Sequence, residues 1–118
     1  MSLNFEKMTV KAQEAIQNSQ KIAEKLNHQQ LLPLHLLHAL LNENQGVVRP
    51  LFNKIGVNWD QLDTIVTGEL NRLPKVTGSS TQISASPALM SVFDKAQDLS
   101  LEMNDEFLST EHLVRALT

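Results

Sequence analysis

The chain has 118 residues, 42% of them apolar, which is long enough for one domain with a packed core. Its formal net charge of −3 and its lack of basic runs argue against a nucleic-acid partner. The absence of cysteine excludes a disulfide framework, and no apolar stretch approaches the length of a membrane span. We therefore expect a cytoplasmic protein with neither a nucleic-acid nor a membrane partner.

The first predicted element is a helix from Thr9 to about Leu26. Thr9 is a favourable N-cap residue. Leucine and alanine are abundant while aromatic residues are scarce, which favours an aliphatic core built from helices. A short helix is predicted next, beginning at Pro33 and reading PLHLLHALL. Apolar or small residues recur along the first helix at the spacing of one face, namely Ala12, Ala15, Ile16, Ser19, Ile22, Ala23 and Leu26.

Two further helices are predicted before a change in composition. One runs from about Val47 to Ile55 and is ended by Gly56. Asn58 then caps a helix that continues to about Leu73. Residues 74–85 are rich in Pro, Gly, Ser and Thr, which is typical of a flexible linker.

After the linker the chain repeats its opening pattern at an offset of 77 residues. Ser86 is a natural N-cap, and Pro87 suits the first helical position. Residues 9–41 and 86–118 align over 33 positions without a gap, with seven identities. The identical pairs are Gln20/Gln97, Asn27/Asn104, Leu31/Leu108, His35/His112, Leu36/Leu113, Ala39/Ala116 and Leu40/Leu117.

This duplication predicts an all-α domain with a pseudo-two-fold repeat of helical units. We expect a single domain over residues 1–118, comprising a first four-helix unit over residues 5–73, a linker over 74–85 and a partial second unit over 86–118. Nothing after Thr118 corresponds to residues 42–73, so we expect the second repeat to be truncated.

The spacing of three histidines raises the possibility of a metal site. His35 and His38 stand three residues apart on a helix, with His28 nearby in sequence, and such pairs can chelate a transition metal. No cysteine or intervening carboxylate completes a ligand set, and Arg115 replaces His38 in the second copy. Because His35 recurs as His112, the pattern favours a structural role in the repeat, and we expect no metal.

Four carboxylates bracket the loop before the last predicted helix. Their default interpretation is a solvated surface, and the alternative is an acidic rim that holds a cationic or amide-rich peptide. No nucleophile elbow or phosphate-binding loop occurs, so the chain is expected to be neither an enzyme nor an ATP-binding protein. The carboxylates are Glu102, Asp105, Glu106 and Glu111.

An ordered set of phrases resembles the amino-terminal domain of the Clp ATPases, which are ring-forming protein unfoldases. The phrases are FEKMTVKAQEAI, LLPLHLLHALL, VVRPLFNKIGV, ELNRLPKVTGS and STEHLVRAL, within a resemblance that runs from Asn4 to Thr118. The match favours the protein-disaggregase branch of this family. The resemblance implies an all-helical domain that engages unfolded or aggregated polypeptides and joins two ATPase modules absent from this chain. ATP and Mg would belong to those modules, so no cofactor is expected here.

The resemblance also implies site residues and partners. Thr9, Asp105 and Glu111 match positions credited with substrate contact. The apolar groove beside them would draw on Phe93, Leu99 and Phe107. The parent protein would be a homohexamer that cooperates with a DnaK-type chaperone, and the isolated domain a monomer.

The sequence is also compatible with two other functions. The chain could be an adaptor-docking domain of a protease-linked unfoldase, which would bind a specific folded partner instead of a denatured one. It could also be a small metal-dependent enzyme built on its histidines, which one equivalent of bound zinc or nickel would reveal.

Overall fold

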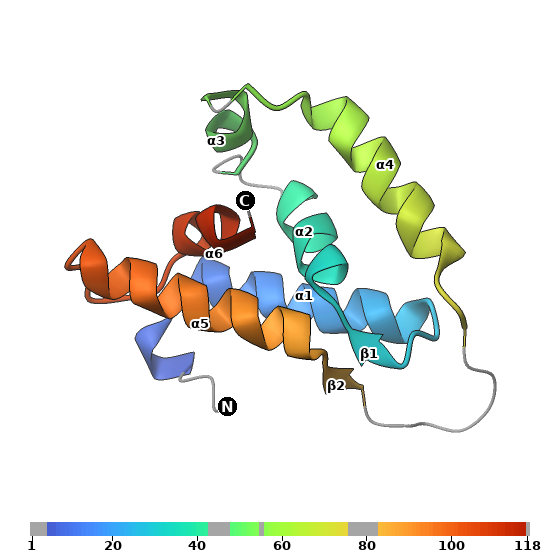
Figure 1. Ribbon diagram of the computed structural model, residues 1–118, viewed down its shortest axis with the longest axis horizontal. Coiled ribbons are helices and arrows are strands. Elements are labelled where there is room, and N and C mark those ends of the chain that lie inside the picture. The colour runs from blue at the N-terminus through green and yellow to red at the C-terminus, as the bar shows by residue number, and fades with distance from the viewer. Residues whose placement is uncertain (1–4, 43–47, 55, 76–82, 118) are drawn as a thin grey trace.

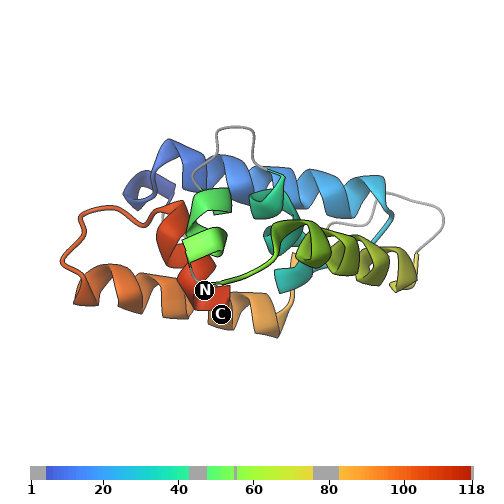
Figure 2. The same cartoon turned by 90° about the horizontal axis from the view of Figure 1, so that it is seen from above.

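The computed structural model describes residues 5–42, 48–54, 56–75 and 83–117, which form six α-helices, one 3₁₀ helix and two short strands. In chain order these are η1 (Phe5–Lys7), α1 (Val10–Lys25), β1 (Gln30–Leu31), α2 (Pro33–Leu41), α3 (Val48–Lys54), α4 (Trp59–Arg72), β2 (Ser84–Ala85), α5 (Pro87–Glu102) and α6 (Thr110–Leu117). In Figure 1 the short helices α2 and α6 lie above the long helices α1 and α5, and in Figure 2, seen from above, they lie between them. The fold is all-α, as the sequence predicted.

The two long helices begin in the same way. The Oγ1 atom of Thr9 accepts a hydrogen bond from the backbone N–H of Ala12 at 3.2 Å. The Oγ atom of Ser86 accepts the equivalent bond from Leu89 at 3.1 Å. Each side chain satisfies one of the backbone donors that the first turn of a helix leaves without a partner. Both predicted N-caps are therefore confirmed.

The backbone pairing displays the pseudo-two-fold relation directly. Strand β1 pairs in parallel with β2, with Leu31 opposite Ala85. An isolated parallel bridge joins Met8 to Leu108. Because 8 + 77 = 85 and 31 + 77 = 108, the two pairings exchange under the same offset that relates the sequence copies.

The loops that follow α1 and α5 also match. Asn27 and Asn104, which are 77 residues apart, both adopt the left-handed conformation with φ of 59° and 56°. Asparagine tolerates this region better than most residues because its short polar side chain can bond locally. Each half therefore turns from its long helix toward its short helix with the same backbone geometry.

The predicted linker is partly wrong. Residues 76–82 lie outside the described residues, but Ser84 and Ala85 at its C-terminal end form strand β2 instead of a flexible segment. The prediction failed because composition reports only local preference, whereas the partner of this strand, β1, lies more than fifty residues earlier in the chain.

Both halves pack into one aliphatic core. Helices α1 and α2 pack together, as do α5 and α6, and α2 also packs against α6 across the pseudo-two-fold axis. Among the described helices, none combines the length and apolar character needed to cross a membrane. The buried core includes Ala12, Ile16, Leu36, Leu40, Leu89, Phe93, Ala96, Leu113 and Val114.

Candidate functional site

A groove of about 370 Å³ lies between η1, the last turns of α5 and the loop that leads to α6. The bridge between Met8 and Leu108 forms part of its wall and ties the N-terminal segment to this loop. We call it the acidic groove and define it by its lining residues, Lys7, Met8, Gln97, Ser100, Leu101, Asp105, Glu106 and Leu108.

Large apolar side chains are exposed around the acidic groove. Leu101, which lines it, is 73% exposed, and Phe107 in the adjoining loop is 43% exposed. Four of the six large apolar residues found exposed in the described part of the chain belong to the segments that build the groove. These four are Phe5, Leu101, Met103 and Phe107, and the other two are Val10 at the start of α1 and Ile65 on α4. Exposed apolar residues gathered at one place are typical of an interaction site.

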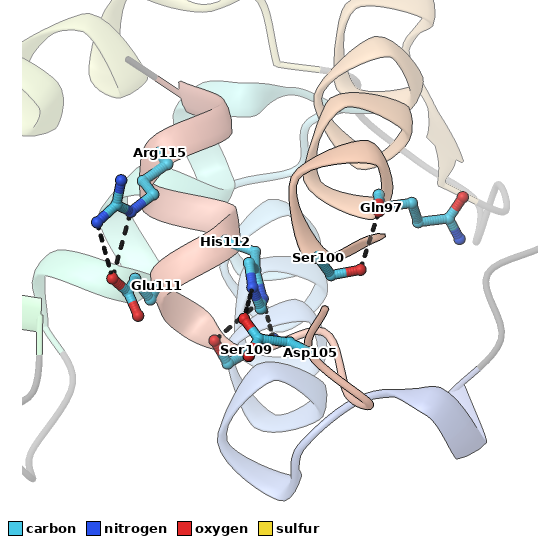
Figure 3. A network of polar contacts seen from close by, with 7 residues as sticks. All are labelled: Gln97, Ser100, Asp105, Ser109, Glu111, His112 and Arg115. Atoms are coloured by element: carbon cyan, nitrogen blue, oxygen red, sulfur yellow. Dashed lines mark hydrogen bonds and ion pairs between the residues drawn. The ribbon is translucent and has the colours of Figure 1, made fainter. Parts of the chain in front are cut away.

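The polar rim is organised by a buried histidine, as Figure 3 shows. The side chain of His112 is 2% exposed, and its Nδ1 atom accepts a hydrogen bond from the Ser109 backbone N–H at 2.8 Å. Its Nε2 atom lies 2.8 Å from Oδ2 of Asp105. The Asp105 side chain is 44% exposed and lines the groove. A buried ring thus holds one oxygen of a carboxylate that faces solvent.

The polar residues predicted for the site lie at different distances from this rim. Asp105 is part of the lining. Thr9 caps α1 and donates its backbone N–H to the Leu108 carbonyl at 2.9 Å, so it stands beside the groove wall. Glu111 accepts hydrogen bonds from Arg115 one turn along α6 at 3.0 and 3.2 Å, and it is not among the lining residues.

The apolar predictions need one correction. Phe93 is 3% exposed and lies in the core, so it offers no surface to a ligand in this conformation. It belongs to the inner stripe of α5, whose burial builds the domain. Leu99 is partly buried and packs against the same core. Only Phe107 of these three is exposed beside the groove.

Leu101, the most exposed apolar residue of the groove, was not among the residues predicted from the sequence. It falls outside the inner stripe of α5, and an exposed leucine on the outer face of an amphipathic helix was the available signal. Lys7, Met8 and Gln97 were missed because they come from segments that only the tertiary fold brings together.

The other half carries a related pocket of about 430 Å³. We call it the histidine pocket, and its lining residues are His28, Gln29, Gln30, Leu32, Leu73, Pro74 and Ser84. Adding 77 to positions 28 and 29 gives Asp105 and Glu106, and subtracting 77 from Ser84 gives Lys7. The two cavities are therefore pseudo-symmetric, but the charges of the acidic groove are replaced by neutral side chains in the histidine pocket.

The histidine pocket contains a buried histidine pair. Nδ1 of His28 lies 2.7 Å from Nε2 of His35, and Nδ1 of His35 accepts the Leu32 backbone N–H at 2.9 Å. Burial lowers the pKa of His35 to about 4, with the neighbouring His28 and His38 acting in the same direction. Burial also lowers the pKa of His28, and the charge of Lys75 adds to this effect.

His28 and His35 are hydrogen-bonded to each other. The Nε2 atom of His28 is buried without a hydrogen-bond partner in the described part of the chain. No group of three or more His, Cys, Asp or Glu side chains suited to a metal ion occurs among the described residues. His35 and His112 both occupy the third position of a short helix and accept the backbone N–H three residues earlier, as the carboxylate of a capping box does.

Known proteins similar to this chain in sequence and in structure belong to one family. The chain matches the Clp repeat N-terminal domain model over residues 7–118. It is 43% identical over 118 residues to the chaperone protein ClpB of Rickettsia bellii, with 98% of this chain and 14% of the relative covered. The Hsp104 N-terminal domain from Candida albicans superposes with a TM-score of 0.84 at 25% identity, covering 93% of this chain and 72% of that one. A ClpV N-domain solved in complex with a VipB peptide has the same fold, with a TM-score of 0.77 at 18% identity over 98% of this chain and 72% of that one.

Proposed function

Because the chain belongs to the Clp N-terminal domain family, we propose that it is a receptor domain for non-native polypeptides, and that the acidic groove is its binding site. An unfolded or aggregated chain would lay apolar side chains against Leu101 and Phe107 and direct hydrogen-bond donors toward Asp105. Thr9 and Glu111 would contribute from the margin of the groove, and Leu99 through its packing against the core beneath the exposed residues of α5. The domain carries out no catalysis.

The observation that supports this proposal most strongly is the concentration of exposed apolar residues beside one half of a symmetric domain. Leu101 and Phe107 stand at the groove, whereas the equivalent positions in the other half, 24 and 30, hold Glu24 and Gln30. Folding alone does not require the difference, since the same backbone is built in both halves. A groove with apolar walls and a polar rim suits extended chains that expose apolar side chains and unpaired backbone groups.

Binding at such a site should be weak and tolerant of sequence. The groove is short, so it buries little surface, and ordering a flexible chain costs conformational entropy. These properties suit a domain that must take up many substrates and release them again.

The role of the longer protein is also a proposal. The chain spans about 14% of the length of the ClpB relatives that it matches. We place the domain in a hexameric ATP-dependent disaggregase that cooperates with a DnaK-type chaperone. The named complex of a ClpV N-domain with a peptide supports peptide capture as a capability of this fold.

The test is a titration of the 118-residue chain with one fluorescently labelled protein in two forms, native and permanently unfolded. Binding to the unfolded form only is the expected result. The variant Leu101→Glu, which installs the residue of the other half, should weaken this binding about tenfold, because it removes an exposed apolar contact and adds a charge. Ile65→Glu on α4 is the matched control, since Ile65 is also exposed at 54% but does not line the groove.

Two outcomes would contradict the proposal. If neither form binds while circular dichroism shows a folded helical domain, the domain alone is no receptor. If Leu101→Glu and Ile65→Glu weaken binding equally, the acidic groove is not the site. Selective binding of one native folded protein would instead favour adaptor docking.

A further inference from the structure

The neighbours of the His112 ring determine which tautomer the neutral imidazole adopts. Its Nδ1 atom accepts a hydrogen bond from the Ser109 backbone N–H, and a ring nitrogen that accepts such a bond carries no proton. In the neutral imidazole the proton therefore resides on Nε2. Nε2–H donates to Oδ2 of Asp105 across 2.8 Å, as Figure 3 shows. The ring therefore accepts a hydrogen bond at the start of α6 and donates one to the carboxylate at the rim of the acidic groove.

The hydrogen bond from His112 restricts the orientation of the Asp105 carboxylate, which the loop alone would not fix. Asp105 lies in the turn after α5, and its side chain is half-exposed to solvent. A buried donor at 2.8 Å selects one side-chain rotamer and engages only Oδ2, so the remaining acceptor positions stay available to a ligand.

We propose that His112 is a positioning residue of the polypeptide site: it orients the Asp105 carboxylate so that its unengaged oxygen accepts a hydrogen bond from an N–H donor of the bound chain. That donor is a backbone amide or the cationic end of a Lys or Arg side chain. The inference rests on the proposed function, because it assigns the chemistry at the rim of the same groove. Glu106 adds a second negative charge to the lining, against the single positive charge of Lys7.

A comparison of His112 with His35, its equivalent in the other half, distinguishes the positioning of Asp105 from helix capping. His35 accepts the Leu32 backbone N–H at 2.9 Å, just as His112 accepts that of Ser109, so both rings stabilise the start of a short helix. The Nε2–H of His35, however, donates to the neutral Nδ1 of His28. Helix capping is therefore common to both halves, and only His112 orients a charged acceptor beside a groove.

Two substitutions at His112 separate its contact with Asp105 from its contacts with Ser109. In His112→Asn, the amide oxygen can replace Nδ1 as the acceptor for Ser109, but the side chain is too short to reach Asp105. In His112→Gln, the amide nitrogen can replace Nε2 as the donor to Asp105, at the cost of the bond from Ser109. We expect His112→Asn to weaken binding of the permanently unfolded protein about tenfold, like Asp105→Asn, and His112→Gln to stay within about twofold of the unsubstituted chain.

A double-variant cycle and a matched control complete this test. In the Asp105→Asn background, His112→Asn should cause no further loss, because its effect passes through Asp105. His35→Asn removes the equivalent bond in the other half and should leave binding unchanged. The inference is overturned if His112→Asn binds normally, if its loss persists in the Asp105→Asn background, or if His35→Asn weakens binding equally.

A spectroscopic measurement on the unsubstituted chain keeps the inference testable if His112→Asn does not fold. Side-chain ¹⁵N spectra should show a protonated Nε2 and an unprotonated Nδ1 for His112. Addition of the unfolded protein should shift the Nε2–H resonance of His112 and leave that of His35 in place. Binding of the unfolded protein without any shift at His112 would overturn this inference alone, whereas failure of the unsubstituted chain to bind would overturn the proposed function.

Discussion

The two halves of this domain share one backbone plan but offer different surfaces. The plan includes the N-caps, the left-handed asparagine turns and the histidine at the third position of each short helix. The two halves differ in the residue to which this histidine is hydrogen-bonded, which is His28 in one half and Asp105 in the other. The comparison shows that residues common to both copies maintain the architecture, and we propose that the residues that differ between the copies create the binding site at the acidic groove.

The largest expected effect is on the free energy of unfolding, and it comes from the core that the two halves share. Leu36 and Leu113 occupy equivalent positions and are both fully buried. Replacing either with Ala should lower the free energy of unfolding by about 3 kcal/mol, since each change removes buried methyl groups and leaves a cavity in one common core. Urea denaturation measures both values. A loss below about 1 kcal/mol for one variant alone would show that the halves do not share the core equally.

The second prediction uses the pKa of His35, which burial lowers from an ordinary 6.5 to about 4. The folded state keeps the ring neutral, so the unfolded state binds more protons between these two values. The stabilisation is complete above pH 6.5 and is lost as the pH falls toward 4, by roughly 2–3 kcal/mol. Urea denaturation at several pH values measures the loss.

His35→Gln is the matched variant for this pH dependence. It has no ring to titrate at position 35, so the free energy of unfolding should fall less between pH 6.5 and 4, even if the variant is less stable at neutral pH. Identical pH dependence in both proteins would show that the histidine pair does not carry the effect.

A smaller effect is expected at the paired N-caps. Thr9→Ala and Ser86→Ala should each lower the free energy of unfolding by about 1 kcal/mol, because each leaves a first-turn backbone N–H without its acceptor. Thr9 stands beside the acidic groove and Ser86 does not, so only Thr9→Ala should also weaken binding of the unfolded protein. Equal binding losses would mean that Thr9 acts only through stability.

The smallest change in stability is expected from exchanging the outer residues of the two long helices. Leu101 and Glu24 are equivalent and both exposed, so Leu101→Glu and Glu24→Leu should each alter the free energy of unfolding by less than about 0.5 kcal/mol. Only Leu101→Glu should weaken binding of the unfolded protein, because Glu24 does not line the acidic groove and Glu24→Leu should leave binding there unchanged. A thermal melt and a fluorescence titration on the same samples check both parts.

The sequence predicted the helices well because their signals are local. Capping residues and apolar periodicity lie within short stretches of the chain, and the repeat presents these local signals twice. Strand β2 was missed because its pairing with β1 is long-range. Of the residues predicted for the site, Asp105 lines the acidic groove and Phe107 is exposed in the adjoining loop, whereas Phe93 is buried, and Leu101 was not among the predictions. Periodicity places a residue on an inner or an outer face, and exposure decides which residues a ligand can reach.

The histidines illustrate the same limit. Their recurrence indicated an architectural role, and both rings do accept the backbone N–H at the start of a short helix. The partner of each second ring nitrogen depends on a residue seven positions earlier, brought close by the turn at Asn27 or Asn104. The sequence shows that His28 and Asp105 are equivalent, but only the fold shows that each faces the histidine of its own half.

The most direct measurement is an NMR titration of the ¹⁵N-labelled chain with a permanently unfolded protein, because the histidine pocket serves as an internal control for the acidic groove. The account predicts amide shifts at residues 7–9 and 97–108, with the signals of residues 28–32 and of Ser84 unchanged. Equal shifts at both cavities, or shifts confined to the histidine pocket, would contradict the claim that the residues that differ between the two copies create the binding site.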